Sequence, residues 1–353
     1  MEEIKIIELF GGIGALTKAF KRLGIPHEIV DYVEIDKYAV ASYNAINGTN
    51  FEPQDICEWN KDIEVDLLMH GSPCQDFSLV GLQKSGDKGS GTRSSLMWET
   101  IRIVEKLKPK YVIWENVKNL LSKKHIHNFN AYLETMEQLG YISYYQVLNA
   151  KDYGIPQNRE RVFTISIRDD TKVYGDYFFP TIDPDVKAIN FSFPQKQELK
   201  LKLKDMLEDE VDEKYYLSEK MIKYISATGT ANFKNSDCKI NLDVARPLTT
   251  DPNKRAGTTN YICKELPSEC NICDMDLKEY KIRKLTPKEY WRLMGFDDED
   301  FEKAEQVNSN TQLYKQAGNS IVVNVLEAIL TNLLLNTEQE KEGQMDIYDF
   351  LAS

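Results

Sequence analysis

The chain has 353 residues and a formal net charge of −12, from 44 basic and 56 acidic side chains. This length suffices for two domains with hydrophobic cores, and the lack of a long uninterrupted apolar segment or a basic leader predicts a cytoplasmic protein that does not span a membrane. The six cysteines are not spaced like a secreted disulfide framework, and none of the four histidines sits in a motif with a partner, which disfavours His-based catalysis.

The first half of the chain alternates short apolar runs with amphipathic stretches, which is the pattern of βα units around a parallel sheet. The expected strands span residues 4–9, 28–34, 67–70, 111–114, 143–149 and 162–167. The expected helices span residues 16–23, 37–47, 97–107 and 128–139. The sequence therefore predicts an α/β fold with a Rossmann-like, mostly parallel sheet and a second, smaller domain.

The pattern changes after Pro180 to charged stretches and scattered loops. A helix is expected there at 195–207, and a buried helix at 321–335, which is apolar almost all round. We expect domain boundaries that give a first domain at 1–170, a small domain at 171–312, a C-terminal helix at 313–336 that returns to the first domain, and a solvated tail at 337–353.

Two loops at the ends of buried strands carry the most informative residues. The apolar run at 65–69 ends before Pro73, which places Cys74 on the carboxyl edge of the sheet, where α/β proteins bind ligands. The strand at 111–114 delivers Glu115 to the same edge. A thiol beside a carboxyl group that can protonate a substrate nitrogen suits covalent attack on an electron-poor ring. Most cysteines are small core hydrophobes, but Pro-Cys-Gln in a glycine-bounded loop is not a core pattern.

A glycine-rich turn at residues 10–14, Phe-Gly-Gly-Ile-Gly, follows the first expected strand. Glycines at such a turn let the backbone approach a ligand closely, although a tight turn alone would also explain them. Glu34 lies at the end of the next strand, where a carboxylate can accept hydrogen bonds from two ribose hydroxyls. NAD is an alternative ligand, but the full dinucleotide fingerprint is absent, because its third glycine would fall at Thr17.

Further blocks make a family resemblance specific. Residues 157–161 are Gln-Asn-Arg-Glu-Arg, and residues 316–320 are Gln-Ala-Gly-Asn-Ser. Together with the glycine-rich turn and the Pro-Cys-Gln and Glu-Asn-Val blocks, they resemble the ordered motifs of the bacterial or phage DNA (cytosine-5) methyltransferases, which use S-adenosyl-L-methionine. The resemblance covers residues 4–168 and 281–330, whereas residues 170–280 match no recognisable pattern.

The resemblance implies a sequence-specific enzyme whose Cys74 adds to C6 of a cytosine that has been flipped out of the helix. Glu115 would protonate or hydrogen-bond N3, so that C5 becomes nucleophilic and accepts the methyl group of S-adenosyl-L-methionine. Arg161 would hold O2 and help to activate the thiol, and Asn116 would orient the loop. Arg159 completes the implied catalytic set; the alternative is that the two arginines form a surface charge pair.

The same resemblance implies a set of cofactor contacts. Phe10 would meet the edge of the adenine, Ile35 would pack on its face, Asp55 would read its amino group, and Ile56 would cover the ring. Asn319 and Ser320 would cap the final helix and contact the carboxylate end of the cofactor. The implied cofactor-binding residues are Phe10, Gly12, Ile13, Gly14, Glu34, Ile35, Asp55, Ile56, Gly71, Pro73, Leu96, Asn319 and Ser320.

Double-stranded DNA is the implied partner, read by the small domain as a target-recognition domain while the first domain supplies catalysis. Gln75 and Ser78 would line the path of the flipped nucleotide, and Lys254 and Arg255 lie in a turn-rich loop suited to DNA contact. The recognised DNA sequence cannot be read, because base contacts would come from the segment without a recognisable pattern.

The net charge of −12 opposes a nucleic-acid partner, since phosphate contacts require Lys and Arg. Basic residues nevertheless collect locally, at 84–93, 159–161, 254–255 and 281–292, which is compatible with a basic cleft. The expected protein is a monomer in a bacterial or phage-infected cell that acts in restriction–modification, with a cognate endonuclease as a further partner, or in DNA protection. An RNA cytosine-5 methyltransferase and a catalytically silent DNA-binding regulator are the alternatives.

Four cysteines fall in the unmatched segment, at positions 238, 263, 270 and 273. Cys270 and Cys273 have the spacing of a zinc-ligand pair, but the other two cysteines do not form a second such pair. The sequence therefore predicts no metal site.

Overall fold

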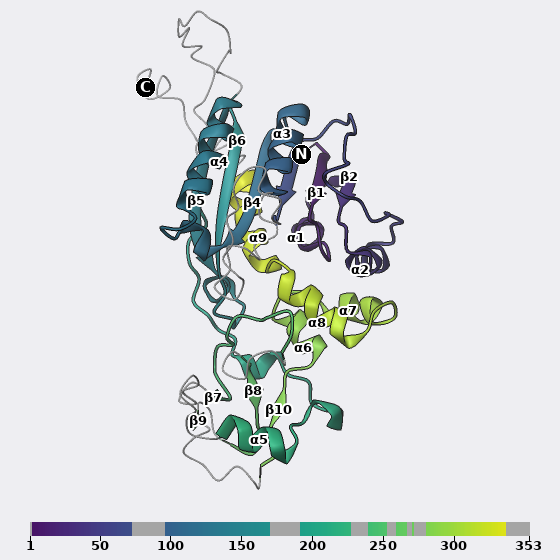
Figure 1. Ribbon diagram of the computed structural model, residues 1–353, viewed down its shortest axis with the longest axis vertical. Helices are drawn as coiled ribbons and strands as arrows, with labels where there is room; N and C mark the ends of the chain where they lie inside the picture. The colour runs from purple at the N-terminus through teal and green to yellow at the C-terminus, as the bar shows by residue number, and fades with distance from the viewer. Residues whose placement is uncertain are drawn as a thin grey trace, which may run out of the picture.

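A six-stranded sheet forms the larger part of the molecule (Figure 1). The computed structural model describes residues 2–72, 96–169, 191–226, 239–252, 259–266, 270–271 and 280–336. The strands of this sheet are β1 (Ile4–Leu9), β2 (His27–Val33), β3 (Leu67–His70), β4 (Tyr111–Val117), β5 (Tyr141–Asn149) and β6 (Glu160–Arg168). All the expected strands are therefore present, with small shifts at their ends.

The strand order is β2-β1-β3-β4-β6-β5. The pairs β1–β2, β1–β3 and β3–β4 are parallel, whereas β6 runs antiparallel to both β4 and β5. The prediction of a Rossmann-like, mostly parallel sheet is confirmed. Because β6 is reversed, its first residues lie at the same edge of the sheet as the last residues of β3 and β4.

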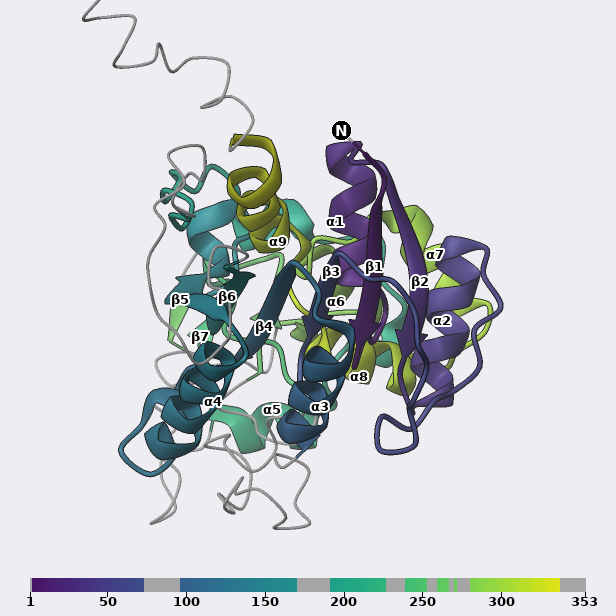
Figure 2. The same cartoon turned by 90° about the horizontal axis from the view of Figure 1, so that it is seen from above.

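Apolar side chains alternate between the two faces of the sheet, and each face has its own core. Ile6 and Ile113 contribute to the core that α1 (Ala15–Leu23) and α9 (Val323–Leu330) cover. Their neighbours in the chain, Ile7 and Val112, face the opposite core under α3 (Met97–Leu107) and α4 (Ile126–Gln138). Figure 2 shows the sheet between these two helical layers.

The helices of the large sheet begin and end close to the positions expected from the sequence. Asp36 caps α2 (Lys37–Asn47) by accepting a hydrogen bond from the Tyr38 backbone N–H at 3.0 Å. Gly48 ends this helix with a φ of 69°, a left-handed conformation that glycine adopts without strain.

The C-terminal helices pack into the core of the large sheet. After α8 (Asn310–Asn319), α9 contacts α1 and continues as a π-helical turn (Thr331–Leu335), so the expected buried helix is present. By length and composition alone, Asn310–Leu335 could cross a membrane, but 50% of its most apolar window is buried within the protein. Its apolar side chains belong to the same core as β1 and β3, which identifies these helices as core elements.

A second, smaller sheet has the order β10-β8-β7-β9. Its strands are two residues long in the described part of the chain: β7 (Lys239–Ile240), β8 (Tyr261–Ile262), β9 (Cys270–Asn271) and β10 (Arg283–Lys284). The helix α5 (Glu219–Ser226) packs on it through Ile222 and Ile225. Figure 1 shows α6 (Pro287–Arg292), α7 (Asp298–Glu305) and α8 between the two sheets. The domain boundaries stay a prediction.

The prediction of a helix at 195–207 is wrong. This segment is extended and contains only a short 3-10 turn, Leu203–Met206. Apart from the hydrogen bonds of that turn, its backbone bonds to distant parts of the chain: Gln197 N–H donates to the Asp152 carbonyl at 2.8 Å, and Leu203 N–H to the Asp243 carbonyl at 2.7 Å. Tertiary contacts therefore override a helical sequence pattern here.

Candidate functional site

Glu115 lies at the carboxyl edge of the large sheet, near the end of β4. The antiparallel strand β6 places Arg161 opposite Val117, so that Arg161 Nε donates to Glu115 Oε1 at 2.9 Å. Burial raises the pKa of Glu115, although Arg161 and Arg159 act in the opposite direction. The structure thus brings the sequence-predicted Glu115 and Arg161 together, with the carboxyl group buried and the guanidinium group half-buried.

Ser72 links the Glu115 strand to the start of the loop that carries Cys74. Its hydroxyl oxygen accepts hydrogen bonds from the Trp114 indole N–H at 3.1 Å and from Asn116 Nδ2 at 3.4 Å. Asn116 Oδ1 also accepts the Val117 backbone N–H at 2.8 Å. The role of Ser72 was not predicted from the sequence; its signal was a polar residue two positions after the end of a buried strand. The loop residues Pro73, Cys74, Gln75 and Ser78 lie outside the described residues.

Arg159 is 3% exposed, and its guanidinium group bonds to backbone carbonyls of distant segments. Nη1 donates to Leu248 at 3.3 Å, and Nη2 donates to Gly318 at 3.0 Å and to Ser320 at 2.9 Å. The alternative that the two arginines form a surface charge pair is therefore wrong, because Arg159 is buried and Arg161 pairs with Glu115. The contacts of Arg159 favour a positioning role, which joins β6 to the chain between α8 and α9.

A pocket opens between the glycine-rich turn and Glu115. The turn, the end of β3 and the segment between α8 and α9 contribute to its wall. The lining residues are Glu8, Leu9, Phe10, Gly11, Gly12, Ala15, Leu16, Met69, Gly71, Glu115, Asn319, Ser320 and Ile321. Residues from four separate parts of the sequence therefore face one cavity, and the candidate catalytic carboxyl group shares it with the candidate cofactor loop.

The glycine-rich turn is shaped by left-handed backbone conformations. Phe10 has a φ of 54° and Gly14 a φ of 81°, and Gly14 is the N-terminal cap of α1. A Cβ on Gly11 would lie 2.6 Å from the Tyr32 ring, so only glycine fits there. Of the residues predicted to touch the cofactor, Ile13 is instead buried in the core beside α1.

Glu34 stands just after β2, next to the glycine-rich turn. Its two carboxylate oxygens accept backbone N–H groups, Oε2 from Gly12 at 3.2 Å and Oε1 from Asp36 at 2.8 Å. Burial raises the pKa of Glu34, although these hydrogen bonds oppose that effect. Ile35, the next residue, is 67% exposed, which leaves an apolar surface beside the carboxylate.

Two further predicted cofactor residues lie on a loop that follows α2. Asp55 is half-buried and its Oδ1 accepts the Cys57 N–H at 2.9 Å, while Ile56 is buried. Leu96 lies at the start of α3 and is partly buried against the core beneath that helix. The structure therefore brings Phe10, Gly12, Gly71, Asn319 and Ser320 into the lining of one pocket. The other described residues of the predicted cofactor set are not among its lining residues: Ile13, Gly14, Glu34, Ile35, Asp55, Ile56 and Leu96.

The expectation that Asn319 and Ser320 cap the final helix is wrong. They end α8: Ser320 is extended, with a φ of −71° and a ψ of 163°, and its N–H donates to the Gln316 and Ala317 carbonyls. The residue that precedes α9 is Val322, which makes no side-chain cap. Arg159 holds the Gly318 and Ser320 carbonyls, which stabilises this break between the two helices.

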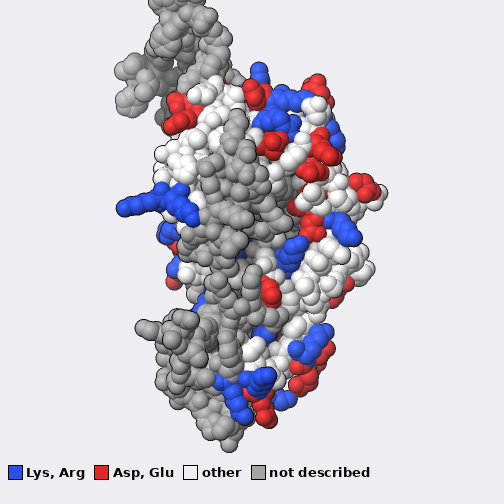
Figure 3. All heavy atoms as spheres, in the orientation of Figure 1, with Lys and Arg blue, Asp and Glu red and all other residues white. Residues whose placement is uncertain are grey.

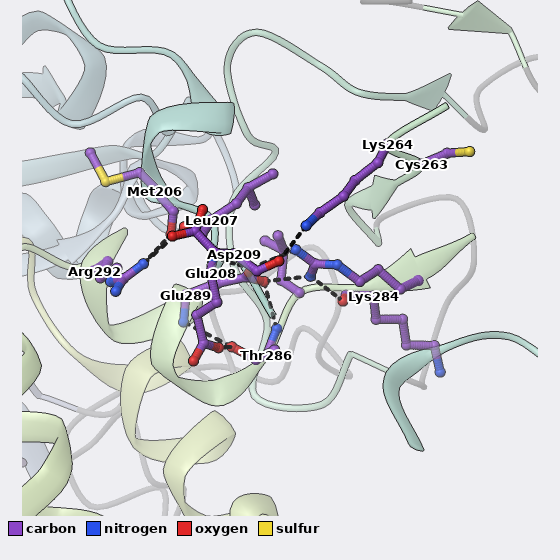
Figure 4. A network of polar contacts seen from close by, with 12 residues as sticks. Met206, Leu207, Glu208, Asp209, Cys263, Lys264, Lys284, Thr286, Glu289 and Arg292 are labelled. Atoms are coloured by element: carbon purple, nitrogen blue, oxygen red, sulfur yellow. Dashed lines mark hydrogen bonds and ion pairs between the residues drawn. The ribbon is translucent and has the colours of Figure 1, made fainter. Parts of the chain in front are cut away.

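The basic cluster at 281–292 does not form a free basic surface. Arg283 is buried and bonds to Glu289, while Lys288 and Arg292 pair with Asp298. Figure 4 shows Arg292 also bonding to the Met206 carbonyl, at 3.2 Å. On the face in Figure 3, basic and acidic side chains are interspersed over the described surface. Lys254 and Arg255, the predicted DNA contacts, lie outside the described residues.

Within the described ranges, the Cys, His, Asp and Glu side chains form no group of three or more that could hold a metal ion. Cys263 is buried, and its thiol donates to Glu265 at 3.0 Å. Cys238 and Cys273 lie outside the described residues, so the prediction of no metal stays a prediction.

Comparison with known proteins agrees with the geometry of the site. The sequence model of the C-5 cytosine-specific DNA methylase family matches residues 4–334. A type II methyltransferase of Lactococcus lactis subsp. cremoris is 34% identical, over 94% of this chain and 99% of its own length. An orphan methyltransferase of Bacillus phage SPbeta is 33% identical, over 98% of this chain and 100% of its own length.

Among solved structures, a methyltransferase of Entamoeba histolytica has the same fold, with a TM-score of 0.72 at 19% identity over 96% of this chain and 99% of its own. The protein belongs to the family of C-5 cytosine-specific DNA methylases and is a DNA (cytosine-5) methyltransferase.

Proposed function

We propose that the protein methylates C5 of a cytosine in a specific sequence of double-stranded DNA, with Cys74 as the nucleophile. The thiolate of Cys74 forms a bond to C6, and the electron pair of the C5–C6 double bond becomes available at C5. Once C5 carries the methyl group, its proton leaves to a base, the C6–sulfur bond breaks, and the ring recovers its aromaticity. The observation that supports this role best is the contact between the buried Glu115 and the half-buried Arg161, beside the segment that leads to Cys74.

Glu115 is suited to the nitrogen N3 of the target ring. Because burial raises its pKa, its carboxyl group can carry a proton more readily than a solvated glutamate, and that proton would stabilise the charge that develops when sulfur adds to C6. Arg161 orients this carboxyl group through Nε, and Nη1 donates to the Glu160 carbonyl at 2.8 Å, so Nη2 is the group that would donate to the ring oxygen O2. The target base reaches so enclosed a pocket only by leaving the duplex.

S-adenosyl-L-methionine is the proposed methyl donor, and it supplies an electrophilic methyl group. The residues present fit it: Phe10 and Gly12 line the pocket, and Glu34 lies beside Gly12 as an acceptor for ribose hydroxyls. Ile35 offers an exposed apolar side chain to the adenine, and Asn319 and Ser320 close the pocket at its other side. The pocket reaches Glu115, so the donor would bind next to the target base.

The curated relatives are type II and orphan methyltransferases of bacteria and phages. We place the activity of this chain in the protection of DNA, either with a cognate restriction endonuclease or as a solitary methylase. The small part of the molecule, with the second sheet, would read the target sequence.

Methylation mapping tests this function directly. Plasmid DNA from a host that expresses the chain should carry 5-methylcytosine in one sequence context, and DNA from a host that expresses Cys74→Ser should carry none. The same mapping on cellular RNA separates the alternatives. Methylated RNA with unmethylated DNA would identify the protein as an RNA cytosine-5 methyltransferase. DNA binding without methylation of either nucleic acid would identify it as a DNA-binding regulator.

A further inference from the structure

The residues proposed to contact the adenine, Asp55 and Ile56, lie on a loop without helix or strand (residues 54–61, the adenine loop). Within the loop, Asp55 accepts the Cys57 N–H through Oδ1 and the Glu58 N–H through its carbonyl, at 2.9 and 3.1 Å. Such local turns do not define where a loop lies relative to the sheet. Two charged side chains from other elements, one buried and one half-buried, hold the loop in place relative to the sheet.

The first is Asp31, in the middle of β2 and only 2% exposed. It receives three donors from the adenine loop: Gln54 Nε2 at 2.9 Å, the Trp59 indole N–H at 2.7 Å and Lys61 Nζ at 2.8 Å. Burial opposes ionisation, but these hydrogen bonds outweigh it and hold the pKa of Asp31 below its ordinary value. One carboxylate therefore connects the first and last residues of the loop.

The second is Arg102, on α3. Its Nη2 donates to the Ile56 carbonyl and its Nη1 to the Trp59 carbonyl, both at 2.8 Å. Its Nε donates to Glu99 at 2.9 Å, which holds the guanidinium plane against the helix. Arg102 thus binds the middle of the adenine loop, on backbone atoms that form no ladder hydrogen bonds of their own.

The adenine loop is also connected to the proposed ribose acceptor. Asp31 stands three residues before Glu34 in the sequence, and Gln54 N–H donates to the Glu34 carbonyl at 2.9 Å. Neither Asp31 nor Arg102 is among the residues that line the pocket at the glycine-rich turn. Asp55, Ile56 and Glu34 lie outside that lining as well, so the proposed adenine contacts extend beyond it. Asp31 and Arg102 contact the adenine loop directly.

We propose that Asp31 and Arg102 are positioning residues for the cofactor, which hold the adenine loop so that Asp55 and Ile56 meet the adenine beside Glu34. This inference rests on the proposed adenine contacts of Asp55 and Ile56. These contacts predict that the two residues affect the affinity for the cofactor and not the rate of the chemical step. A lost charge-assisted hydrogen bond in a buried site weakens binding, whereas the geometry at Glu115 and Arg161 stays intact.

The test compares Asp31→Asn and Arg102→Met with the wild-type full-length chain. Each variant should raise the dissociation constant for S-adenosyl-L-methionine, measured by calorimetry, by about tenfold to a hundredfold. The kcat at saturating cofactor should change by less than about twofold, because the reacting groups are not touched. Arg102→Lys keeps the charge and should recover part of the lost affinity. Glu64→Gln, at an exposed ion pair with Lys5, is the matched control and should leave the affinity unchanged.

Hydrogen exchange gives a second measurement on the cofactor-free protein. The Cys57 and Glu58 amides should exchange faster in Asp31→Asn and Arg102→Met, while amides in the core strand β3 keep wild-type protection. If Asp31→Asn does not fold, Lys61→Met removes one donor from a half-exposed side chain and should still raise the dissociation constant by about threefold.

Asp55→Ala separates this proposal from the one on which it rests. If Asp55→Ala weakens cofactor binding while Arg102→Met and the Asp31 or Lys61 variants bind as wild type does, the positioning role is wrong and the adenine site stands. If Asp55→Ala also binds as wild type does, the adenine site itself is wrong. A lower kcat with unchanged affinity in Arg102→Met would equally contradict the positioning role.

Discussion

The two sheets are stabilised in different ways. The large sheet has apolar cores on both faces and strands of four to nine residues, whereas the described strands of the second sheet have two residues each. In the second sheet, side chains bond to backbone groups that lack a ladder partner: Asn241 Nδ2 donates to the Cys263 carbonyl at 2.7 Å and to the Leu266 carbonyl at 2.9 Å. The large sheet therefore rests on two extensive apolar cores, whereas the second sheet combines a small apolar cluster, which includes Ile222, Ile225 and Ile240, with individual polar contacts.

The largest expected effect is on the rate of the chemical step and comes from a residue of the large sheet. Glu115→Gln keeps the size of the side chain but cannot act as an acid, so the chemical step should slow by about 10²–10⁴-fold. Single-turnover methylation of duplex DNA measures this step. Cofactor affinity and thermal stability should stay near wild type, since the Gln side-chain oxygen can still accept the Arg161 Nε–H and Arg161 is partly exposed to solvent.

Glu160→Gln is the control for this variant, because Glu160 forms an exposed pair with Lys118 at the start of the neighbouring strand β6. Its single-turnover rate should match that of the wild type. A Glu115→Gln rate within about threefold of wild type would remove Glu115 from the chemical step.

The second effect concerns the link to the smaller sheet. Arg283 and Glu289 form a buried pair with both guanidinium Nη atoms engaged, and Glu289 also accepts the Glu208 and Thr286 N–H groups. Arg283→Met would leave the Glu289 carboxylate buried without its cation, so the free energy of unfolding should fall by about 3–5 kcal/mol. Urea unfolding monitored by fluorescence measures the change.

Lys281→Met is the matched control, two residues earlier, at an exposed pair with Glu213. The free energy of unfolding of this variant should fall by less than about 1 kcal/mol. Equal losses in the two variants would mean that the second region does not depend on the buried polar contact, and the contrast between the two sheets would be lost.

The third prediction concerns Glu8, whose carboxylate accepts the Thr17 N–H and hydroxyl beneath the glycine-rich turn. Burial raises its pKa from 4.5 to about 7. The folded protein therefore keeps a proton that the unfolded chain loses, so this contribution to stability is complete below pH 4.5 and is lost as the pH rises through about 7. Glu8→Gln, which carries no charge, should be more stable than wild type at pH 8 by up to about 3 kcal/mol.

Denaturant unfolding of both proteins from pH 4.5 to pH 8 gives the comparison, with the exposed Glu3→Gln as control. The difference between Glu8→Gln and wild type should grow with pH, and that between Glu3→Gln and wild type should not. A constant difference for Glu8→Gln would show that Glu8 is ionised in the folded state over the whole range.

The smallest effect concerns the proposed ribose acceptor. Glu34→Ala removes a carboxylate that also accepts the Gly12 and Asp36 N–H groups, so S-adenosyl-L-methionine binding should weaken by about 1.5–3 kcal/mol. Calorimetry measures the affinity, with the exposed Glu28→Gln on β2, the strand that Glu34 follows, as control. Unchanged affinity in Glu34→Ala would remove this residue from the cofactor site.

The sequence predicted the large sheet well because its signals are local. Helix 37–47 is bounded by a capping aspartate and a glycine, and the strands are short apolar runs. The reversed direction of β6 and the extended segment at 195–207 depend on contacts with distant residues, which no local pattern contains. Ser72, Asp31 and Arg102 were missed for the same reason: each is a single polar residue whose partners lie elsewhere in the sequence.

Covalent trapping tests the central claim most directly. Duplex DNA whose target cytosine carries fluorine at C5 has no removable proton there, so the enzyme should remain bound through Cys74 after methyl transfer, as an adduct that survives denaturation. Cys74→Ser should form no adduct and show no turnover, because a neutral hydroxyl is a far weaker nucleophile, while it still binds the cofactor. An adduct of equal yield with Cys74→Ser would mean that another residue attacks the base. It would contradict the assignment of Cys74, at the carboxyl edge of the sheet, as the nucleophile.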